Sequence, residues 1–492
     1  MSFRRILCQG DPIVLAGMNL PTLVELLARA IVEHLGDYAV VVDPLGTSRF
    51  FSPNSIQNFP PTPTMNAVDA EVSAALMTLP PRTVHFLVLR NGVSDAQLAA
   101  FLGVASAYFD VATPIRAYAH RFDPLPPDVT AWLNPFGRGM PAIMLPASTT
   151  GNAGAATFYT IDMGWNAPSP PERDSCRMRL SPSQVNAAAA EPIWSSIATT
   201  TRATLERWAR TVTWRRVAIC ISGGGASVFR LVPLFQAFED EGLPIDLLAG
   251  VSGGAIFSSC YAFGGLPKVQ ELANRGISLT AAVMGGLLST RFVKYYIDDF
   301  FDHCGVCNTE MRVVALSTRI APMSPPRAAA AMDGTFGEAN RASGGAPFFD
   351  AYFVGDSRQA DGAFLAGLPP PFLAERFGAD IVFAMNVMAL PANRFPGETI
   401  PILGDIMSVF YRYTPLGRIA DTWGASSTML HTLAEGAGLH ANVFVDTTPR
   451  DWAPIEQFQF YNATTYSSIG LGPGVDVADV ALECVQRWRN LP

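Results

Sequence analysis

The chain has 492 residues, of which 49% are hydrophobic and only 15% are charged, and its 34 basic and 42 acidic residues give a net charge of -8 at pH 7. A charged share below the roughly 25% of an average soluble protein excludes a disordered chain, and the acidic balance argues against nucleic acid as a partner. At roughly 150 residues per domain, the length predicts two to four domains.

Neither the N-terminal segment nor any later stretch has the pattern of a secretory or membrane-spanning segment. The first residues, MSFRRILCQGDPIVLAG, include two arginines, but Gln9 and Asp11 interrupt the apolar run that a secretory signal needs. Seven cysteines, spread from Cys8 to Cys484, fit a reducing compartment better than a disulfide framework. We therefore expect a cytoplasmic protein, for which any contact with a membrane is peripheral.

Residues 12 to about 120 alternate short apolar runs with helical periodicity, which is the pattern of an α/β domain. A helix is predicted over 21–34, and the sequences YAVVVD (38–43) and TVHFLVLR (83–90) are predicted to be buried parallel strands. The loops contain neither of the glycine motifs that bind nucleotide phosphates. We expect residues 1–160 to form a smaller α/β domain of unknown role.

The stretch from about 122 to 198 is rich in Pro, Ser, Asn, Ala and Thr, which predicts irregular structure, and we expect 161–212 to be a linker with a basic helix. The helical sequence 201–216 carries Trp208 and Trp214 among its arginines. Such a helix could lie on an anionic membrane surface. The commoner outcome is a linker helix whose tryptophans pack on the next domain.

From 213 to 492 strand and helix patterns alternate again. IVFAMNV (381–387) and ANVFVD (441–446) are predicted strands, and 477–488 is a predicted amphipathic helix. We expect this region to form a second α/β domain.

The clearest chemical signal is a G-x-S-x-G sequence, Gly250-Val251-Ser252-Gly253-Gly254, which follows a predicted strand at 245–249 and precedes a predicted helix. This context is typical of a nucleophile elbow, a sharp turn that holds a serine in a strained conformation between small residues. The helix that follows favours negative charge at its start. The sequence therefore predicts Ser252 as a nucleophile, with Gly250 and Gly254 as the flanking residues of the elbow.

Three consecutive glycines, Gly223, Gly224 and Gly225, follow the predicted strand 217–221. Gly225 precedes Ser252 by 27 residues, which is the length of one strand-turn-helix-strand unit, so both turns should emerge at the same edge of a parallel sheet. Their amide groups are then candidates for an oxyanion hole. A dinucleotide-binding turn is disfavoured, because a valine stands where its third glycine would be.

A nucleophilic serine needs a base, and the residues alone leave two kinds of base open. A Ser-His-Asp hydrolase would use a later histidine, and His303, His431 and His440 follow Ser252. None of them lies in a glycine-flanked turn. Asp361, in contrast, lies in a sharp turn of sequence ADGA after an apolar stretch.

Four ordered motifs resemble those of the patatin-like phospholipases. The stretch ATLERWARTVTWRRVAICISGGGA (203–226), which leads into GLPIDLLAGVSGGA (242–255), is similar to the bacterial relatives of neuropathy target esterase. The motifs are SGGGAS (222–227), GVSGG (250–254), RASGGAPFF (341–349) and DGA (361–363). The resemblance implies a three-layer α/β hydrolase domain with a central, mostly parallel sheet. It also implies a serine esterase that cleaves carboxylic esters of acyl lipids, either phospholipid or lysophospholipid, without a metal ion or organic cofactor.

Carried over residue by residue, the resemblance implies that Ser252 is the nucleophile, that Asp361 is its base and that Gly223 to Gly225 form the oxyanion hole. One departure concerns the Arg/Lys-Gly pair that usually follows the glycines in the family, because Ser227-Val228 stands there instead. This leaves open how the glycine loop is held. Two alternatives to a Ser-Asp esterase remain. One is a catalytically inactive, lipid-binding regulatory protein on the same fold, and the other is a Ser-His-Asp α/β-hydrolase.

Overall fold

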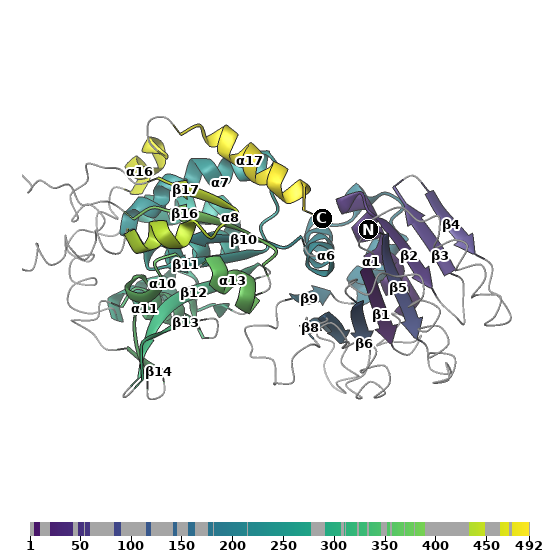
Figure 1. The fold of residues 1–492 in the computed structure, drawn as a ribbon, viewed down its shortest axis with the longest axis horizontal. Helices are drawn as coiled ribbons and strands as arrows, with labels where there is room; N and C mark the ends of the chain where they lie inside the picture. Colours follow the sequence, from purple (N-terminus) through teal and green to yellow (C-terminus); the bar gives the residue numbers. More distant parts are fainter. Residues whose placement is uncertain are drawn as a thin grey trace, which may run out of the picture. The chain divides into compact units, whose positions relative to one another are not determined.

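The structure is a computed structural model, and its chain divides into two compact units, Met1–Arg215 with Pro492 and Arg216–Leu491 (Figure 1). Each unit is described by itself. The residues that the structure describes are 4–9, 20–42, 48–53, 55–59, 83–89, 115–119, 141–144, 156–162, 176–180, 182–213, 215–276, 291–306, 309, 311–321, 324–331, 334–345, 352–354, 357–368, 370–377, 379–388, 432–447, 463–471 and 475–491.

Unit 1 contains a mixed sheet whose described strands have the order β4-β3-β2-β5-β1-β6-β7-β8-β9. The central strands β2, β5, β1, β6 and β7 are parallel, and both flanks are antiparallel. The two strands predicted at 38–43 and 83–90 are confirmed as parallel neighbours, with Tyr38 opposite Thr83. The strands are β1 (Arg4–Gln9), β2 (Tyr38–Val42), β3 (Ser48–Ser52), β4 (Ser55–Phe59), β5 (Thr83–Leu89), β6 (Ile115–Ala119), β7 (Pro141–Met144), β8 (Ala156–Asp162) and β9 (Cys176–Leu180).

Helix α1 (Leu20–Leu35) confirms the helix predicted over 21–34, and it packs against α5 (Pro182–Ala190) and α6 (Thr199–Val212). The stretch that we expected to be a linker therefore contributes β9, α5 and α6 to unit 1. The expected basic helix is present as α6, whereas composition missed β9 and α5. The alanine-rich α5 looks irregular in sequence and is stabilised by packing against α1.

The basic helix α6 is held by packing. Trp208 is fully buried, and Arg210 is buried with its Nη1 2.7 Å from Nε2 of His34. Beyond the helix, the buried Arg215 forms an ion pair with Asp37 at 3.2 Å. Trp208, Arg210 and Arg215 are therefore packing residues and not part of an exposed basic face, whereas Trp214 lies outside the described residues.

Unit 2 contains a mixed, mostly parallel sheet with the order β14-β15-β12-β11-β10-β16-β17, and β13 pairs with β12. Strands β12, β11, β10, β16 and β17 are parallel, and β13, β14 and β15 are antiparallel to their neighbours. The strands are β10 (Val217–Ile221), β11 (Leu247–Val251), β12 (Arg312–Ile320), β13 (Arg327–Ala331), β14 (Tyr352–Val354), β15 (Ser357–Asp361), β16 (Ile381–Asn386) and β17 (Val443–Asp446). The predicted strands at 217–221, 381–387 and 441–446 are thus confirmed.

Every residue of β10, β11 and β16 is buried, as expected for parallel strands that helices cover on both faces. Alternate residues of these strands pack against α12 and α13, and α8 contacts β10, β11 and β12. The helices are η3 (Gly225–Leu231), α7 (Val232–Asp240), α8 (Gly253–Arg275), α10 (Arg291–Phe300), α11 (Phe336–Ser343), α12 (Ala363–Ala366), α13 (Pro370–Phe377), α16 (Ala463–Ile469) and α17 (Val477–Arg489). This α/β arrangement brings the loops after β10 and β11 to the same sheet edge (Figure 1).

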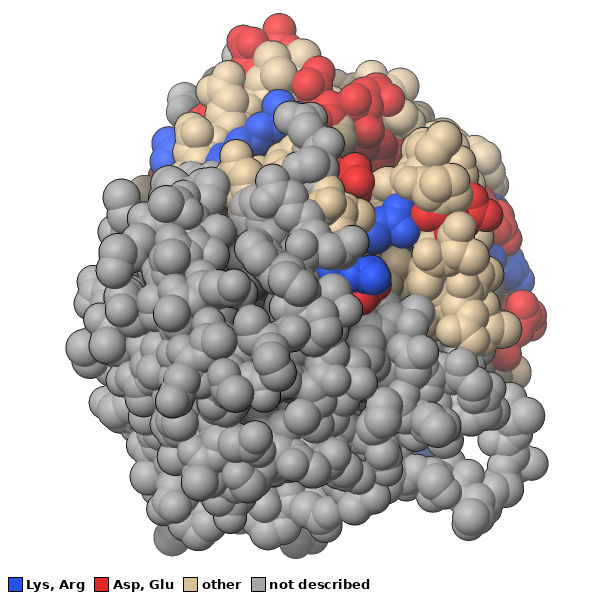
Figure 2. Space-filling view, turned by 90° about the vertical axis from the view of Figure 1, so that its right-hand side faces the viewer, with Lys and Arg blue, Asp and Glu red and all other residues tan. Residues whose placement is uncertain are grey.

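The described surface carries both signs of charge. Figure 2 shows acidic and basic side chains interspersed with other residues on one face of the molecule. Among the described residues, no helix has the length and apolar character needed to cross a bilayer.

Candidate active site

The predicted nucleophile, Ser252, lies in a sharp turn between strand β11 and helix α8. Its backbone has φ 52° and ψ -118°, so it adopts the left-handed region that residues with a side chain rarely enter. Such a conformation costs about 1–3 kcal/mol and persists only where the surroundings enforce it. The residue is partly exposed, so it is not enclosed in the core.

The two glycines predicted to flank the elbow lie where no side chain fits. A Cβ atom on Gly250 would lie 2.1 Å from the Gly254 carbonyl oxygen, and one on Gly254 would lie 2.6 Å from the Ile221 carbonyl oxygen. Gly253, which sequence reasoning did not single out, is equally constrained, because its Cβ would lie 2.3 Å from the Gly225 carbonyl oxygen. Close backbone contact between β11, α8 and the loop after β10 therefore requires glycine at all three positions.

The glycine loop lies beside the elbow because β10 and β11 are parallel neighbours, with Ile221 opposite Gly250. A Cβ on Gly223 would lie 3.4 Å from the Cβ of Ser252. Gly225 contacts the residue after the nucleophile, whereas Gly224 lies against the Val387 carbonyl group. The structure thus brings two of the three predicted glycines to the elbow directly and the third to the segment that follows β16.

Ser227 links the glycine loop to the segment after β16. The residue is fully buried, and its Oγ lies 2.5 Å from the Gly224 carbonyl oxygen and 2.6 Å from the Val387 carbonyl oxygen. A hydroxyl has one hydrogen to donate, so it serves one of these carbonyls at a time. The loop in this chain is therefore held by a neutral side chain.

Asp361, the predicted base, is the last residue of β15, which pairs antiparallel with β12. Its carboxylate accepts a hydrogen bond of 2.9 Å from the Ala363 N–H group, and the Ser252 hydroxyl lies close enough to lower the pKa of the carboxyl. Gly362 follows it, and a Cβ there would lie 2.4 Å from the Leu316 carbonyl oxygen. The D-G-A turn therefore places a carboxylate against the hydroxyl of the elbow serine.

The environment makes this carboxylate more basic than an ordinary aspartate. Burial raises the pKa of Asp361 to about 6, against the opposing effects of the hydrogen bond from Ala363 and of the nearby Ser252 hydroxyl. A carboxylate with a pKa near 6 is still ionised at neutral pH, and it accepts a proton more readily than one near 4.

The histidines that could have served as a base lie elsewhere. His303 and His440 are exposed residues that follow α10 and the helix at 432–438, and neither forms a hydrogen bond with Ser252 or Asp361. His431 lies outside the described residues. Among the residues that the structure describes, no group of His, Cys, Asp and Glu side chains could hold a metal ion.

Comparisons with known proteins leave the family open. No family model and no curated protein matches the chain. Among solved structures, the crystal structure of VipD from Legionella pneumophila is similar at 11% sequence identity, with a TM-score of 0.28 over 56% of this chain and 67% of that chain.

Proposed function

We propose that the chain is a patatin-type serine hydrolase that cleaves carboxylic ester bonds of acyl lipids, with phospholipid or lysophospholipid as substrate. The observation that carries this proposal is the proximity of the Ser252 hydroxyl to the Asp361 carboxylate, at an elbow serine with left-handed backbone. The acyl-lipid class rests on the resemblance of the four motifs. Neither a metal ion nor an organic cofactor is needed for this chemistry.

In the first half of the reaction, the Ser252 Oγ attacks the ester carbonyl carbon and its proton passes to the Asp361 carboxylate. The carbonyl oxygen becomes an oxyanion, which backbone N–H groups of the glycine loop can stabilise because glycines allow a close approach. The bond to the leaving alcohol then breaks, and Asp361 returns the proton to that alcohol. The product is an acyl-enzyme.

In the second half, a water molecule attacks the acyl-enzyme and gives one proton to Asp361. The bond between the acyl carbon and the Ser252 Oγ breaks, and the proton returns from Asp361 to the serine. The free fatty acid leaves, so one water is consumed for each ester bond broken. The pKa of about 6 lets Asp361 both take and return the proton near neutral pH.

We predict that a fluorophosphonate probe labels the folded chain on Ser252, because such probes react with a serine whose hydroxyl is activated by a base. Mass spectrometry of the digested adduct identifies the labelled residue. The matched control is Ser258, a fully buried serine on the same helix whose Oγ has no hydrogen-bond partner, and we expect no adduct there. A folded chain without an adduct, or with the adduct on another serine, would contradict the proposal and favour an inactive lipid-binding protein.

The labelling rate should rise with pH, with a midpoint near 6. Below that pH Asp361 is protonated and cannot accept the serine proton, and above it the carboxylate is ionised and acts as the base. The measurement is the rate constant for probe labelling between about pH 4.5 and 8.5, with folding checked by circular dichroism at each pH. A rate that does not change across this range would rule out Asp361 as the base.

A further inference from the structure

Ser343, the last residue of α11, contacts the backbone of the elbow serine. Its side chain is fully buried, and its Oγ accepts a hydrogen bond of 2.9 Å from the Ser252 N–H group. The same hydroxyl donates a hydrogen bond of 2.6 Å to the Leu316 carbonyl oxygen of β12. Ser343 therefore ties the strained turn to a strand of the central sheet, with both its donor and an acceptor site in use.

The same short segment also holds the backbone of the base. The Gly362 N–H group donates to the Ser343 carbonyl oxygen at 3.2 Å, and the Asp361 N–H group donates to the Gly345 carbonyl oxygen at 2.7 Å. Residues 343–345 thus hydrogen-bond to the turn of Ser252 through a side chain and to the turn of Asp361 through the backbone. A shift of this segment would move the two residues relative to each other.

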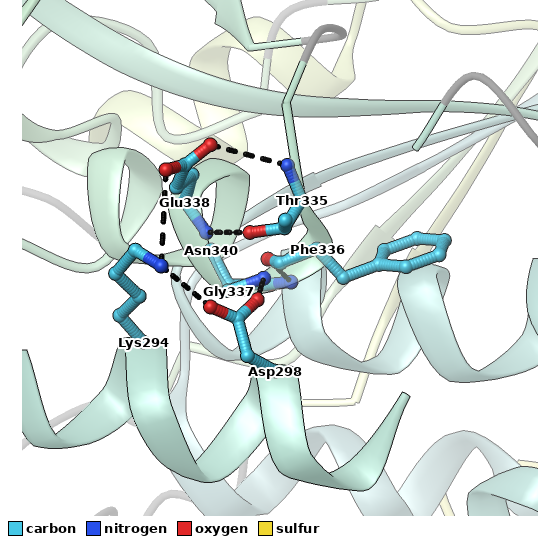
Figure 3. A network of polar contacts seen from close by, with 7 residues as sticks. All are labelled: Lys294, Asp298, Thr335, Phe336, Gly337, Glu338 and Asn340. Atoms are coloured by element: carbon cyan, nitrogen blue, oxygen red, sulfur yellow. Dashed lines mark hydrogen bonds and ion pairs between the residues drawn. The ribbon is translucent and has the colours of Figure 1, made fainter. Parts of the chain in front are cut away.

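The start of α11 is anchored by a polar network (Figure 3). Asp298 of α10 accepts hydrogen bonds from Lys294 at 2.6 Å and from the Gly337 N–H group at 2.9 Å. Thr335 and Glu338 form a reciprocal capping box with two hydrogen bonds of 3.2 Å. Burial alone would raise the pKa of Asp298, but the hydrogen bonds from Lys294, Thr335 and Gly337 outweigh burial and lower it. The helix therefore begins at a well-fixed point.

The middle of α11 is also bound to α8, the helix that follows Ser252. The buried Asn340 donates a hydrogen bond of 3.0 Å to the Ser259 Oγ of α8. This contact and the network at the start of α11 fix the helix in place, and with it Ser343 at the end of the helix. The hydroxyl of Ser343 is then a fixed acceptor rather than a mobile one.

We propose that Ser343 is a positioning residue for ester hydrolysis, and that its hydroxyl holds the backbone of Ser252 in the conformation that directs the Oγ at Asp361. The inference rests on the proposed function. Without the Ser343 hydroxyl, the Ser252 N–H group loses its acceptor and the left-handed conformation loses one of the contacts that enforce it. The serine Oγ then moves away from the carboxylate.

The test compares Ser343→Ala with Ser258→Ala. Both changes remove one oxygen from a fully buried serine, but the Ser258 hydroxyl has no hydrogen-bond partner. We expect Ser343→Ala to lower kcat about 10- to 100-fold with little change in KM, because misplacing a reacting group by about 1 Å can cost that much. Ser258→Ala should retain the activity of the unchanged chain.

A second readout separates positioning from a general loss of stability. The Ser252 hydroxyl lowers the pKa of Asp361 against the effect of burial, so displacing that hydroxyl in Ser343→Ala should move the midpoint of the pH profile upward. If Ser343→Ala does not fold, Ser343→Cys replaces it, because a thiol of similar size is a weaker acceptor and should give the same changes in smaller measure.

The outcomes distinguish this inference from the function on which it rests. An active chain in which Ser343→Ala, or Ser343→Cys in its place, matches Ser258→Ala in kcat and in pH midpoint would overturn the role of Ser343 and leave the hydrolase intact. A folded, unchanged chain that neither reacts with the probe nor hydrolyses acyl esters would overturn the proposed function and this inference together.

Discussion

Replacing Ser252 with alanine, or Asp361 with asparagine, should reduce acyl-ester hydrolysis by at least about 1,000-fold. Ser252→Ala removes the oxygen that forms the acyl-enzyme, and Asp361→Asn removes the group that takes its proton. The two residues act as a unit, so the double variant should be about as active as the less active of the two single variants. The measurement is kcat/KM on a lysophospholipid, with fluorophosphonate labelling of each variant as an independent check.

Loss of activity in Asp361→Asn should not come from unfolding. The pKa of Asp361 predicts the direction in which this substitution changes the stability of the fold. Its folded-state pKa of about 6 lies above the ordinary value of 3.8, so the folded protein binds this proton more tightly than the unfolded chain does. Ionisation of Asp361 therefore lowers stability as pH rises from about 4 through 6. An asparagine side chain carries no charge at any of these pH values, so Asp361→Asn should unfold at the same or a higher temperature than the unchanged chain at about pH 8.

Thermal unfolding at about pH 8 and pH 4 tests this sign, because any gain in stability should vanish where the aspartate itself is protonated. A variant that keeps its fold and its activity would show that the residue replaced is not part of the catalytic pair. A variant that melts well below the unchanged chain at pH 8 would contradict the direction of the Asp361 pKa shift.

The elbow and the glycine loop could be predicted because their signals are local. Both motifs follow apolar strands, and the spacing between Gly225 and Ser252 fits one strand-turn-helix-strand unit, so the parallel pairing of β10 with β11 could be anticipated. The predicted second strand at 245–249 is shifted in the structure to 247–251, which makes Ser252 follow it directly.

The pairing of Ser252 with Asp361 could not be derived from the residues alone. It depends on β15 lying antiparallel to β12, and β12 in turn lies beside β11. Nothing in a periodic pattern predicts which strands become neighbours across such distances in the sequence, so three histidines remained open as bases. Only the resemblance selected the aspartate.

The roles of Ser227 and Ser343 were equally hidden, for the same physical reason. Each hydroxyl bonds a backbone carbonyl on a distant element, Ser227 at Val387 and Ser343 at Leu316. A serine in a sequence carries no sign of a remote carbonyl partner. The Ser227 contact also shows that a neutral, buried hydroxyl fixes the glycine loop to the segment after β16.

Replacing Gly250 with alanine should abolish activity and destabilise unit 2. The new Cβ would lie 2.1 Å from the Gly254 carbonyl oxygen and 2.4 Å from the Ala255 nitrogen, all backbone atoms that cannot swing aside as a side chain could. Relief requires that β11 and the start of α8 separate, which displaces Ser252 from Asp361. We expect a loss of about 1–3 kcal/mol or more in the free energy of unfolding, and at least about a 100-fold loss in kcat.

Gly436 provides the matched control for Gly250→Ala. It lies in the helix at 432–438, and a Cβ there would meet no atom within 4 Å. Gly436→Ala should therefore keep full activity and raise stability by about 0.4–1 kcal/mol, because alanine restricts the unfolded chain and favours helix. The measurements are the free energy of unfolding in urea and the hydrolysis rate of both variants. If Gly250→Ala behaves like Gly436→Ala, then the close contact between strand and helix does not hold the elbow, and the geometry argued for Ser252 is wrong.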